Sequence, residues 1–264
     1  MSSQSLPQTT IDRFGGIARL YGTAALEKFS RAHVAVIGIG GVGSWAVESL
    51  ARSGIGKITM VDLDEVCVTN INRQLHAMDG EIGKQKTDAM AERIKLINPE
   101  CEVVCEQTFY NEKTSDRLLA NDFDFVIDAI DLMMQKALLL AECKKRNIPV
   151  VCCGGAGGKM DPSRIRVADL SKVTRDALIH KVRTRLRCHF GFPKAVNLKA
   201  PKFNIEAIFY DEPAVFPAAA ECDTDESDNT SMRLNCASGF GSVTHMTATL
   251  GLFAAQRAIN QLAK

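Results

Sequence analysis

The sequence contains no uninterrupted run of about 18 apolar residues, the length that a membrane-spanning helix needs. The nearest candidate, Ala237–Ala258, includes eight polar residues, which suits a helix buried against protein. Residues 1–10 are polar and lack the apolar stretch of a secretion signal. The nine cysteines show no regular spacing, so no disulfide framework is predicted. These absences favour a soluble cytoplasmic protein with no membrane partner.

No internal repeat and no clear linker interrupts the 264 residues, which we interpret as one domain, 1–264. Hydrophobic residues make up 46% and charged residues 24%, as in an average globular protein. A chain of this length buries enough surface to fold without a metal or a disulfide.

Short apolar runs alternate with segments of helical spacing over the first 158 residues. Strands are predicted at Val34–Ile37, Lys57–Val61, Glu102–Cys105, Phe123–Ile127 and Ile148–Cys152, with helices at Thr23–Ser30, Val42–Ser53, Lys84–Ile97, Lys113–Ala120 and Met133–Arg146. Continuously apolar strands are typical of a parallel sheet covered on both faces. The sequence therefore predicts an α/β, Rossmann-like, mostly parallel sheet with helices on both faces.

The rhythm changes after Gly158. Extra strands are predicted at Arg164–Val167 and Phe203–Phe209, a basic helix at Asp176–His189 and a closing helix at Gly239–Leu262. We expect a nucleotide-binding part over about 30–158 and a modified C-terminal third, about 159–264, for the substrate and a dimer contact.

A glycine turn follows the first strand. Its pattern Gly-x-Gly-x-x-Gly places Gly38, Gly40 and Gly43 between a strand and a helix, with Gly41 beside Gly40. In this context the glycines allow a tight turn, a close approach of phosphate and close helix–strand packing. Asp62 ends the next strand, where a carboxylate accepts hydrogen bonds from ribose hydroxyls. This arrangement predicts nucleotide binding.

Further charged residues favour cleavage of a phosphoanhydride over hydride transfer. Arg73 and Lys86 are suited to neutralise charge that grows on phosphates, and Asp131 is suited to hold Mg²⁺ through oxygen. The alternative for each is an ordinary surface ion pair. We predict Arg73, Lys86 and Asp131 as the catalytic residues and ATP with Mg²⁺ as the cofactors.

Taken together, these motifs resemble the adenylating fold of ubiquitin-activating-like enzymes, which includes the molybdopterin- and thiamine-biosynthesis adenylyltransferases. The resemblance implies that a carboxylate is activated by attack on the α-phosphate of ATP. It also implies a set of nucleotide contacts beyond the glycines, at Asp62, Asp64, Asn70, Arg73, Gln74, Lys86 and Asp131.

A narrower resemblance extends over almost the whole chain. The strings Arg13–Gly22, Cys67–Asn70, Gly154–Gly158 and Asn235–Gly241 are similar to those of the tRNA threonylcarbamoyladenosine dehydratases. This family implies adenylation of the carboxylate of N6-threonylcarbamoyladenosine in the tRNA anticodon loop, followed by ring closure. AMP and pyrophosphate are released.

Two alternatives stay open from the sequence. One is an adenylyltransferase for a sulfur-carrier protein that ends in Gly-Gly, although such enzymes usually carry Cys-x-x-Cys pairs and this chain has none. The other is a nucleotide-binding scaffold that partners a cysteine desulfurase without catalysis of its own.

Basic residues gather in one stretch although the net charge is only +1. Between Lys172 and Lys202 there are nine lysines and arginines against one acid, and an acidic cluster follows at Glu221–Asp228. The stretch predicts either a solvated helix face or a tRNA footprint. The candidate substrate residues are Lys136, Gly155, Lys181, Arg183, Arg185 and Arg187. Phe203 and Phe209 are candidates for base stacking, with core packing as the favoured interpretation.

The remaining candidates concern partners and ions. Cys236 is either a reactive thiol or a buried small side chain. The backbone of Gly154–Gly158 is a candidate site for Na⁺ or K⁺. Relatives form homodimers in which an N-terminal arginine reaches the partner's ATP, and Arg13 and Arg19 are the candidates here.

Overall fold

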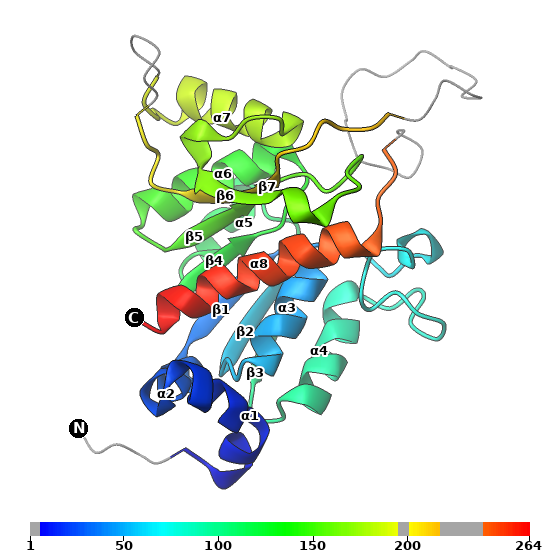
Figure 1. The fold of residues 1–264 in the computed structure, drawn as a ribbon, viewed down its shortest axis with the longest axis vertical. Coiled ribbons are helices and arrows are strands. Elements are labelled where there is room, and N and C mark those ends of the chain that lie inside the picture. The colour runs from blue at the N-terminus through cyan, green and yellow to red at the C-terminus, as the bar shows by residue number, and fades with distance from the viewer. Residues whose placement is uncertain (1–5, 195–200, 217–239) are drawn as a thin grey trace.

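The protein is described here from a computed structural model that covers residues 6–194, 201–216 and 240–264 (Figure 1). Seven strands in these ranges form one sheet in the order β3-β2-β1-β4-β5-β7-β6. Their bounds are β1 His33–Ile37, β2 Lys57–Val61, β3 Glu102–Glu106, β4 Phe125–Asp128, β5 Val150–Cys153, β6 Ile165–Asp169 and β7 Glu206–Tyr210. Only β6 runs antiparallel to its neighbour. The predicted α/β, mostly parallel sheet is therefore confirmed.

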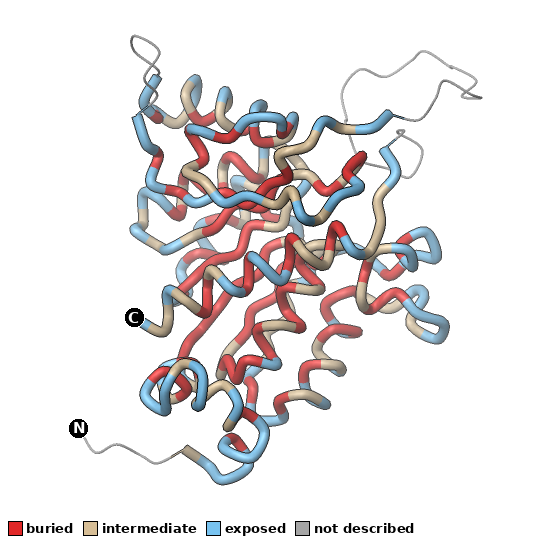
Figure 2. The backbone as a smooth tube through the Cα atoms, viewed as in Figure 1, coloured by how far each residue is buried: buried red, intermediate tan, exposed pale blue. Residues whose placement is uncertain are grey.

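Alternate side chains of β1 face opposite layers of helices. Val34 and Val36 pack with α3 (Gly43–Arg52), α4 (Lys86–Ile97) and α8 (Thr244–Leu262), which crosses the sheet in Figure 1. Ala35 and Ile37 pack with α5 (Glu112–Leu118) and α6 (Met133–Lys145). Both faces of the central strands are buried, as Figure 2 shows.

The C-terminal third extends the sheet beyond β5. The helix α7 (Ala177–His189) packs with α6 and with β7 in a core cluster of its own. Short 3-10 helices lie at Val68–Asn70, Pro162–Arg164 and Leu170–Lys172. None of the helices in the described ranges combines the length and apolar character of a bilayer span.

The sheet order places a topological switch between β1 and β4. The chain runs from β1 outward to β2 and β3 and then returns to pair β4 with β1, so that Ile37 and Asp128 are partners. Open parallel sheets bind ligands in the crevice beyond the strand ends at such a point. The glycine turn after Ile37 and the loop after Asp128 meet there.

The N-terminal helix α1 (Gln8–Tyr21) was not predicted as a helix, and α2 (Thr23–Arg31) follows it directly. Gly15 and Gly16 lie in the middle of α1 and weaken its local helical signal. Of its residues, only Thr10 and Phe14 are buried, so its apolar pattern is also faint.

Several predicted boundaries shift, and the strands predicted from Phe123 and Ile148 begin at Phe125 and Val150. The strand predicted from Phe203 begins at Glu206, because the amides of Phe203 and Asn204 donate to the Asp169 carboxylate instead of to the sheet. The helix predicted from Lys84 begins at Lys86, after Gly83 with a φ of 87°. The closing helix begins at Thr244 rather than at 239.

Candidate active site

The glycine turn is packed so tightly that side chains are excluded at two positions. Gly38 has a φ of 92°, and a Cβ on it would lie 2.8 Å from the Ala129 carbonyl oxygen. A Cβ on Gly43 would lie 1.8 Å from the Gly38 carbonyl oxygen. Both contacts are far inside van der Waals distance, so glycine is required at each. The turn therefore leads from β1 into α3 as the pattern predicts.

Asp62, at the end of β2, binds the glycine turn through its carboxylate. Oδ2 accepts from the Ile39 amide at 2.6 Å and Oδ1 from the Asp64 amide at 2.9 Å. Burial raises the pKa of Asp62, and the nearby Lys86 charge opposes this rise. Asp62 thus positions the turn, and its contact with a ribose stays a prediction.

Lys86 is the first residue of α4 and is almost fully buried, with 5% of its surface exposed. Its ammonium Nζ lies 2.8 Å from Oδ2 of Asp64, whose side chain is largely exposed. The Lys86 amide also donates to the Asp64 carbonyl at 3.0 Å. The cation is therefore fixed at the end of β2, with a carboxylate partner that is open to solvent.

The Arg73 side chain lies against the glycine turn. A Cβ on Gly41 would be 3.5 Å from Arg73 Cγ, so the stem of the arginine passes beside the turn. Its guanidinium Nη1 donates to the Thr69 carbonyl at 2.7 Å. The structure thus brings Arg73 to the same turn as Asp62, as predicted.

Two residues that the sequence did not indicate position Arg73. The Thr247 hydroxyl in α8 and the Trp45 indole in α3 donate to the Arg73 carbonyl, at 3.0 Å and 3.3 Å. Asn72 beside it donates to the Ser242 carbonyl at 2.7 Å. The sequence signal that could have indicated Thr247 was the set of polar residues within the otherwise apolar closing helix.

The amides of Asn70 and Gln74 are buried next to the turn. Asn70 is buried, and its Oδ1 accepts from the Cys67 amide at 3.2 Å. Gln74 Oε1 has no hydrogen-bond partner within the described ranges. A buried amide oxygen without a partner costs free energy unless a ligand or water satisfies it. Both residues therefore suit the predicted nucleotide contacts.

His76 is a buried residue of this region that the sequence did not indicate. Neither ring nitrogen has a partner among the described residues. Burial, together with the Lys86 charge, lowers the pKa of His76 to about 4. The imidazole is therefore neutral at physiological pH.

Asp131 lies three residues beyond β4 and is exposed. Within the described ranges no group of three or more histidine, cysteine or acidic side chains forms a metal cage. Magnesium does not require such a cage, because one or two carboxylates and the phosphates of a substrate suffice. An exposed carboxylate at the switch point fits this donor set, and Asp131 is the residue that would hold the ion.

Lys136, predicted as a substrate residue with an exposed helix lysine as the alternative, does not lie on the surface. It is fully buried, so it is not a solvated helix lysine, and its ammonium pairs with Asp128 at 2.9 Å. The structure gives it no surface with which to contact a tRNA phosphate.

Gly155, another predicted substrate residue, is partly exposed. An added Cβ would meet no atom of the described residues within 4 Å, and the Gly155 amide donates to Asp176 Oδ2 at 2.9 Å.

The basic helix α7 has two different sides. Ile179, Val182 and Leu186 are buried, so the helix is a packed element and not a fully solvated one. A groove of about 390 Å³ runs along the other side of α7. The α7 groove is lined by Met133, His180, Lys181, Thr184, Arg185, Cys188 and His189. Met133, the first residue of α6, lines this groove and follows Asp131 by two residues.

The other two predicted arginines point elsewhere. Arg183 donates to the Val173 carbonyl and contacts His180 Nδ1 at 3.2 Å. Arg187 donates to the Pro193 carbonyl and lies 5.4 Å from the centre of the Phe203 ring. Phe203 and Phe209 are buried, at 2% and 5% exposure, so core packing is their role.

The comparisons with known proteins agree with this geometry. Residues 16–264 match the model of the ThiF family. A tRNA threonylcarbamoyladenosine dehydratase of Haemophilus influenzae is 51% identical over 252 residues, which cover 96% of this chain and 94% of the relative. The chain belongs to the ThiF family, among the tRNA threonylcarbamoyladenosine dehydratases.

Solved structures of this family superimpose on nearly the whole chain. The Escherichia coli tRNA N6-threonylcarbamoyladenosine dehydratase in complex with ATP has a TM-score of 0.86 and 42% identity, covering 98% of this chain and 96% of that one. The same enzyme in complex with AMP has a TM-score of 0.86 and 43% identity, with coverage of 98% and 97%. The ThiF-family fold and its extension beyond β5 are thus shared.

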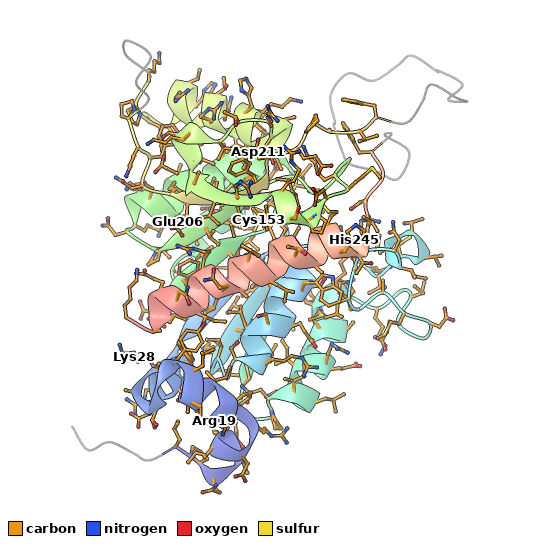
Figure 3. All side chains as sticks on the ribbon, viewed as in Figure 1. Arg19, Lys28, Cys153, Glu206, Asp211 and His245 are labelled. Carbon is orange, nitrogen blue, oxygen red and sulfur yellow. The ribbon has the colours of Figure 1, made fainter. Side chains whose placement is uncertain are left out.

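The two candidate N-terminal arginines, Arg13 and Arg19, lie on α1, at the opposite end of the molecule from α7 (Figure 1). Arg13 donates to the carbonyl of Ile97, the last residue of α4, and lines a groove of about 430 Å³ with Arg52 and Arg93. Arg19 is exposed on α1, well away from His245 at the start of α8 (Figure 3). Cys236 and the acidic cluster Glu221–Asp228 lie outside the described residues.

Proposed function

We propose that this chain is an ATP-dependent tRNA-modifying enzyme that adenylates the carboxylate of N6-threonylcarbamoyladenosine in the anticodon loop and closes it to the cyclic form. The proposal is supported by three observations: Arg73 passes beside Gly41, Lys86 pairs with Asp64 just beyond β2, and the loop that leads from Asp128 to Asp131 contacts Gly38 through Ala129. The near full-length similarity to named dehydratases supports the same substrate. We expect the reaction to take place in the cytoplasm.

The reaction proceeds in two steps. A carboxylate oxygen bonds to the α-phosphorus of ATP while the bond to the pyrophosphate oxygen breaks. A nucleophilic atom of the same modified side chain then bonds to the acyl carbon, AMP leaves with the former carboxylate oxygen, and one proton is lost. The tethered nucleophile gains a large effective molarity, so no covalent enzyme intermediate is needed.

The residues of this chain supply charge and position. Lys86 and Arg73 stabilise the negative charge that grows on the phosphates in the first step, where preorganised cations act most strongly. Bound Mg²⁺ would shield the triphosphate, with Asp131 as its protein ligand. Gly40, Gly41 and the amides of Asn70 and Gln74 complete the nucleotide contacts.

The tRNA backbone is proposed to follow the α7 groove. Lys181, Arg185 and Met133 line it, and Met133 follows Asp131 by two residues. A base in a single-stranded anticodon loop is the least costly to unstack, so it can enter the switch-point crevice while phosphates stay on α7. Arg183 and Arg187 are proposed to support the helix and not the phosphates.

A homodimer is proposed from the position of Arg13. This arginine contacts the last residue of α4, whereas Lys86 is the first, and a helix of 12 residues is about 18 Å long. Arg13 therefore lies too far from Lys86 of its own chain to contact the same triphosphate. Any role in catalysis requires the nucleotide of a second copy, and the exposed Arg19 is the other candidate.

Three further assignments complete the proposal. Backbone carbonyls of 154–158 are proposed to bind Na⁺ or K⁺, in a loop held by the Asp176 carboxylate. Cys236 is proposed as a reactive thiol, the residue through which a cysteine desulfurase system would act. The nucleotide and substrate parts divide near residue 158.

The test is to incubate the protein with ATP and with tRNA that carries threonylcarbamoyladenosine. We expect AMP, pyrophosphate and a nucleoside lighter by one water. The control is the same tRNA made without the modification, which should give neither AMP nor a lighter nucleoside. Pyrophosphate exchange only with a Gly-Gly-ending carrier protein would favour the sulfur-carrier alternative. No product with either substrate would favour the scaffold.

A further inference from the structure

Lys136 and Asp128 form an ion pair with no exposure to solvent. Nζ of Lys136 lies 2.9 Å from Oδ2 of Asp128, and the exposed fraction of both side chains is 0%. Burying two charges is costly, and an apolar pair of similar volume usually stabilises a fold at least as well. The free energy of unfolding therefore does not explain why this pair is present.

Both side chains of the pair form hydrogen bonds with the backbone of one short loop. Lys136 Nζ donates to the Ile130 carbonyl at 2.8 Å and to the Asp128 carbonyl at 3.4 Å. Asp128 Oδ1 accepts from the Ile130 amide at 3.2 Å. Both the amide and the carbonyl of Ile130 are therefore held, which fixes the backbone between the end of β4 and Asp131.

The ammonium keeps its charge in this setting. Burial by itself would lower the pKa of Lys136, but the Asp128 carboxylate outweighs it and raises the pKa above its ordinary value. A charged donor makes stronger hydrogen bonds to carbonyl oxygens than a neutral one. The Asp128 carboxylate thus favours the charged form of the lysine that holds the loop.

The loop connects two features of the proposed nucleotide site, the glycine turn and Asp131. The Ala129 carbonyl oxygen is the atom that a Cβ on Gly38 would meet at 2.8 Å, so the loop forms a wall of the glycine turn. Asp131, the proposed magnesium ligand, is the next residue after Ile130. A shift of the Ile130 peptide would move both features.

We propose that Lys136 is a positioning residue for adenylation, which locks residues 128–130 so that Asp131 stands beside the glycine turn. It acts through the loop and does not touch tRNA. This inference rests on the proposed role of Asp131 in the reaction.

The test compares three variants of the full-length protein. Asp128→Leu with Lys136→Met replaces the pair by apolar side chains, Asp131→Asn removes the proposed magnesium ligand, and Lys145→Met changes an exposed lysine of the same helix as a control. The measurements are the melting temperature, the Kd for ATP without tRNA, and the rate of AMP formation with modified tRNA over a range of Mg²⁺ concentrations.

In the double variant we expect a melting temperature and an ATP Kd close to those of the unchanged protein. The rate of AMP formation should fall about 100-fold, because a misplacement of about 1 Å has that effect on an oriented reaction. The Mg²⁺ concentration for half-maximal rate should rise, which a purely structural role would not produce. Lys145→Met should behave as the unchanged protein.

The outcomes separate the inference from the function on which it rests. A double variant with an unchanged rate, beside an inactive Asp131→Asn, would overturn the positioning role alone. An active Asp131→Asn would overturn the proposed role of Asp131, and the inference with it. If the double variant does not fold, Asp128→Asn keeps the shape of the side chain and should show the same Mg²⁺ shift with a rate loss of about 10-fold; an unchanged Mg²⁺ dependence there would refute the proposal.

Discussion

Lys86 Nζ and Asp64 Oδ2 lie 2.8 Å apart, so the buried ammonium that we place at the triphosphate is paired with an exposed carboxylate. The partner can move into solvent when phosphates arrive, whereas the buried lysine stays in place. Lys86 is therefore preorganised, and its loss should affect the chemical step most.

Lys86→Met should lower the rate of AMP formation about 100-fold, because one preorganised charge contact at the transition state is removed. The measurement is AMP release from ATP with modified tRNA at saturating concentrations of both. Lys84→Met is the matched control, since Lys84 pairs with Glu81 and Glu92 on the surface. Equal loss in both variants would point to a general effect on α4.

Thr247→Val should raise the KM for ATP about fivefold, since it removes one hydrogen bond of about 1 kcal/mol to the Arg73 carbonyl. Trp45 still holds that carbonyl, so the effect should be moderate. Steady-state kinetics at varied ATP check this. Thr249→Val serves as the control, because the Thr249 hydroxyl donates to the His245 carbonyl within α8; the idea fails if both substitutions change the KM alike.

Replacing Lys181 and Arg185 together by alanine should weaken tRNA binding and make it less sensitive to salt. Two lost phosphate contacts to a single-stranded loop should reduce the slope of log affinity against log salt by about 1.4. Filter binding from 50 to 300 mM salt measures the slope, with ATP affinity as the internal check. Arg166→Ala, on the edge strand β6, is the control; an unchanged slope in the double variant would exclude the α7 groove as the tRNA path.

Glu48→Gln should destabilise the fold by about 2 kcal/mol at pH 7, because Glu48 accepts hydrogen bonds from both Arg52 and Arg93. Burial would raise the pKa of Glu48, but the bonds from Arg93 and Arg52 outweigh it and lower the pKa. The stabilisation is therefore complete above about pH 4.5, the unperturbed pKa, and is lost as the pH falls through the lowered pKa of the folded state.

Urea unfolding of Glu48→Gln and of the unchanged protein at pH 7 and at pH 3 checks this. The difference in the free energy of unfolding should shrink at the lower pH, where the carboxyl group takes up a proton. A difference that stays constant with pH would show that the arginine contacts are not its source.

The elements of the candidate nucleotide site could be predicted from the sequence because their signals are local. The glycines of the turn, Asp62 at a strand end and Lys86 at a helix start are each read from neighbouring residues. Parallel strands then bring their ends together at one edge, so that these local features share a site without further information.

Features that depend on distant partners were not predictable in this way. The burial of Lys136 depends on Asp128, eight residues earlier on a strand, and lysines are almost never buried unless paired. The support of Arg73 by Thr247 joins residues 174 positions apart. The shifted start of β7 results from Asp169, which takes the amides of Phe203 and Asn204 from the sheet.

The contact between Thr247 and Arg73 has a consequence for synthesis of the chain. The glycine turn, the arginine and the Asp131 loop are all translated by the chain's midpoint, yet the arginine segment gains its α8 partner only from the last helix. While α8 is still being synthesised, the Arg73 carbonyl therefore lacks its Thr247 hydrogen bond, and the Trp45 indole in α3 is the partner that holds it.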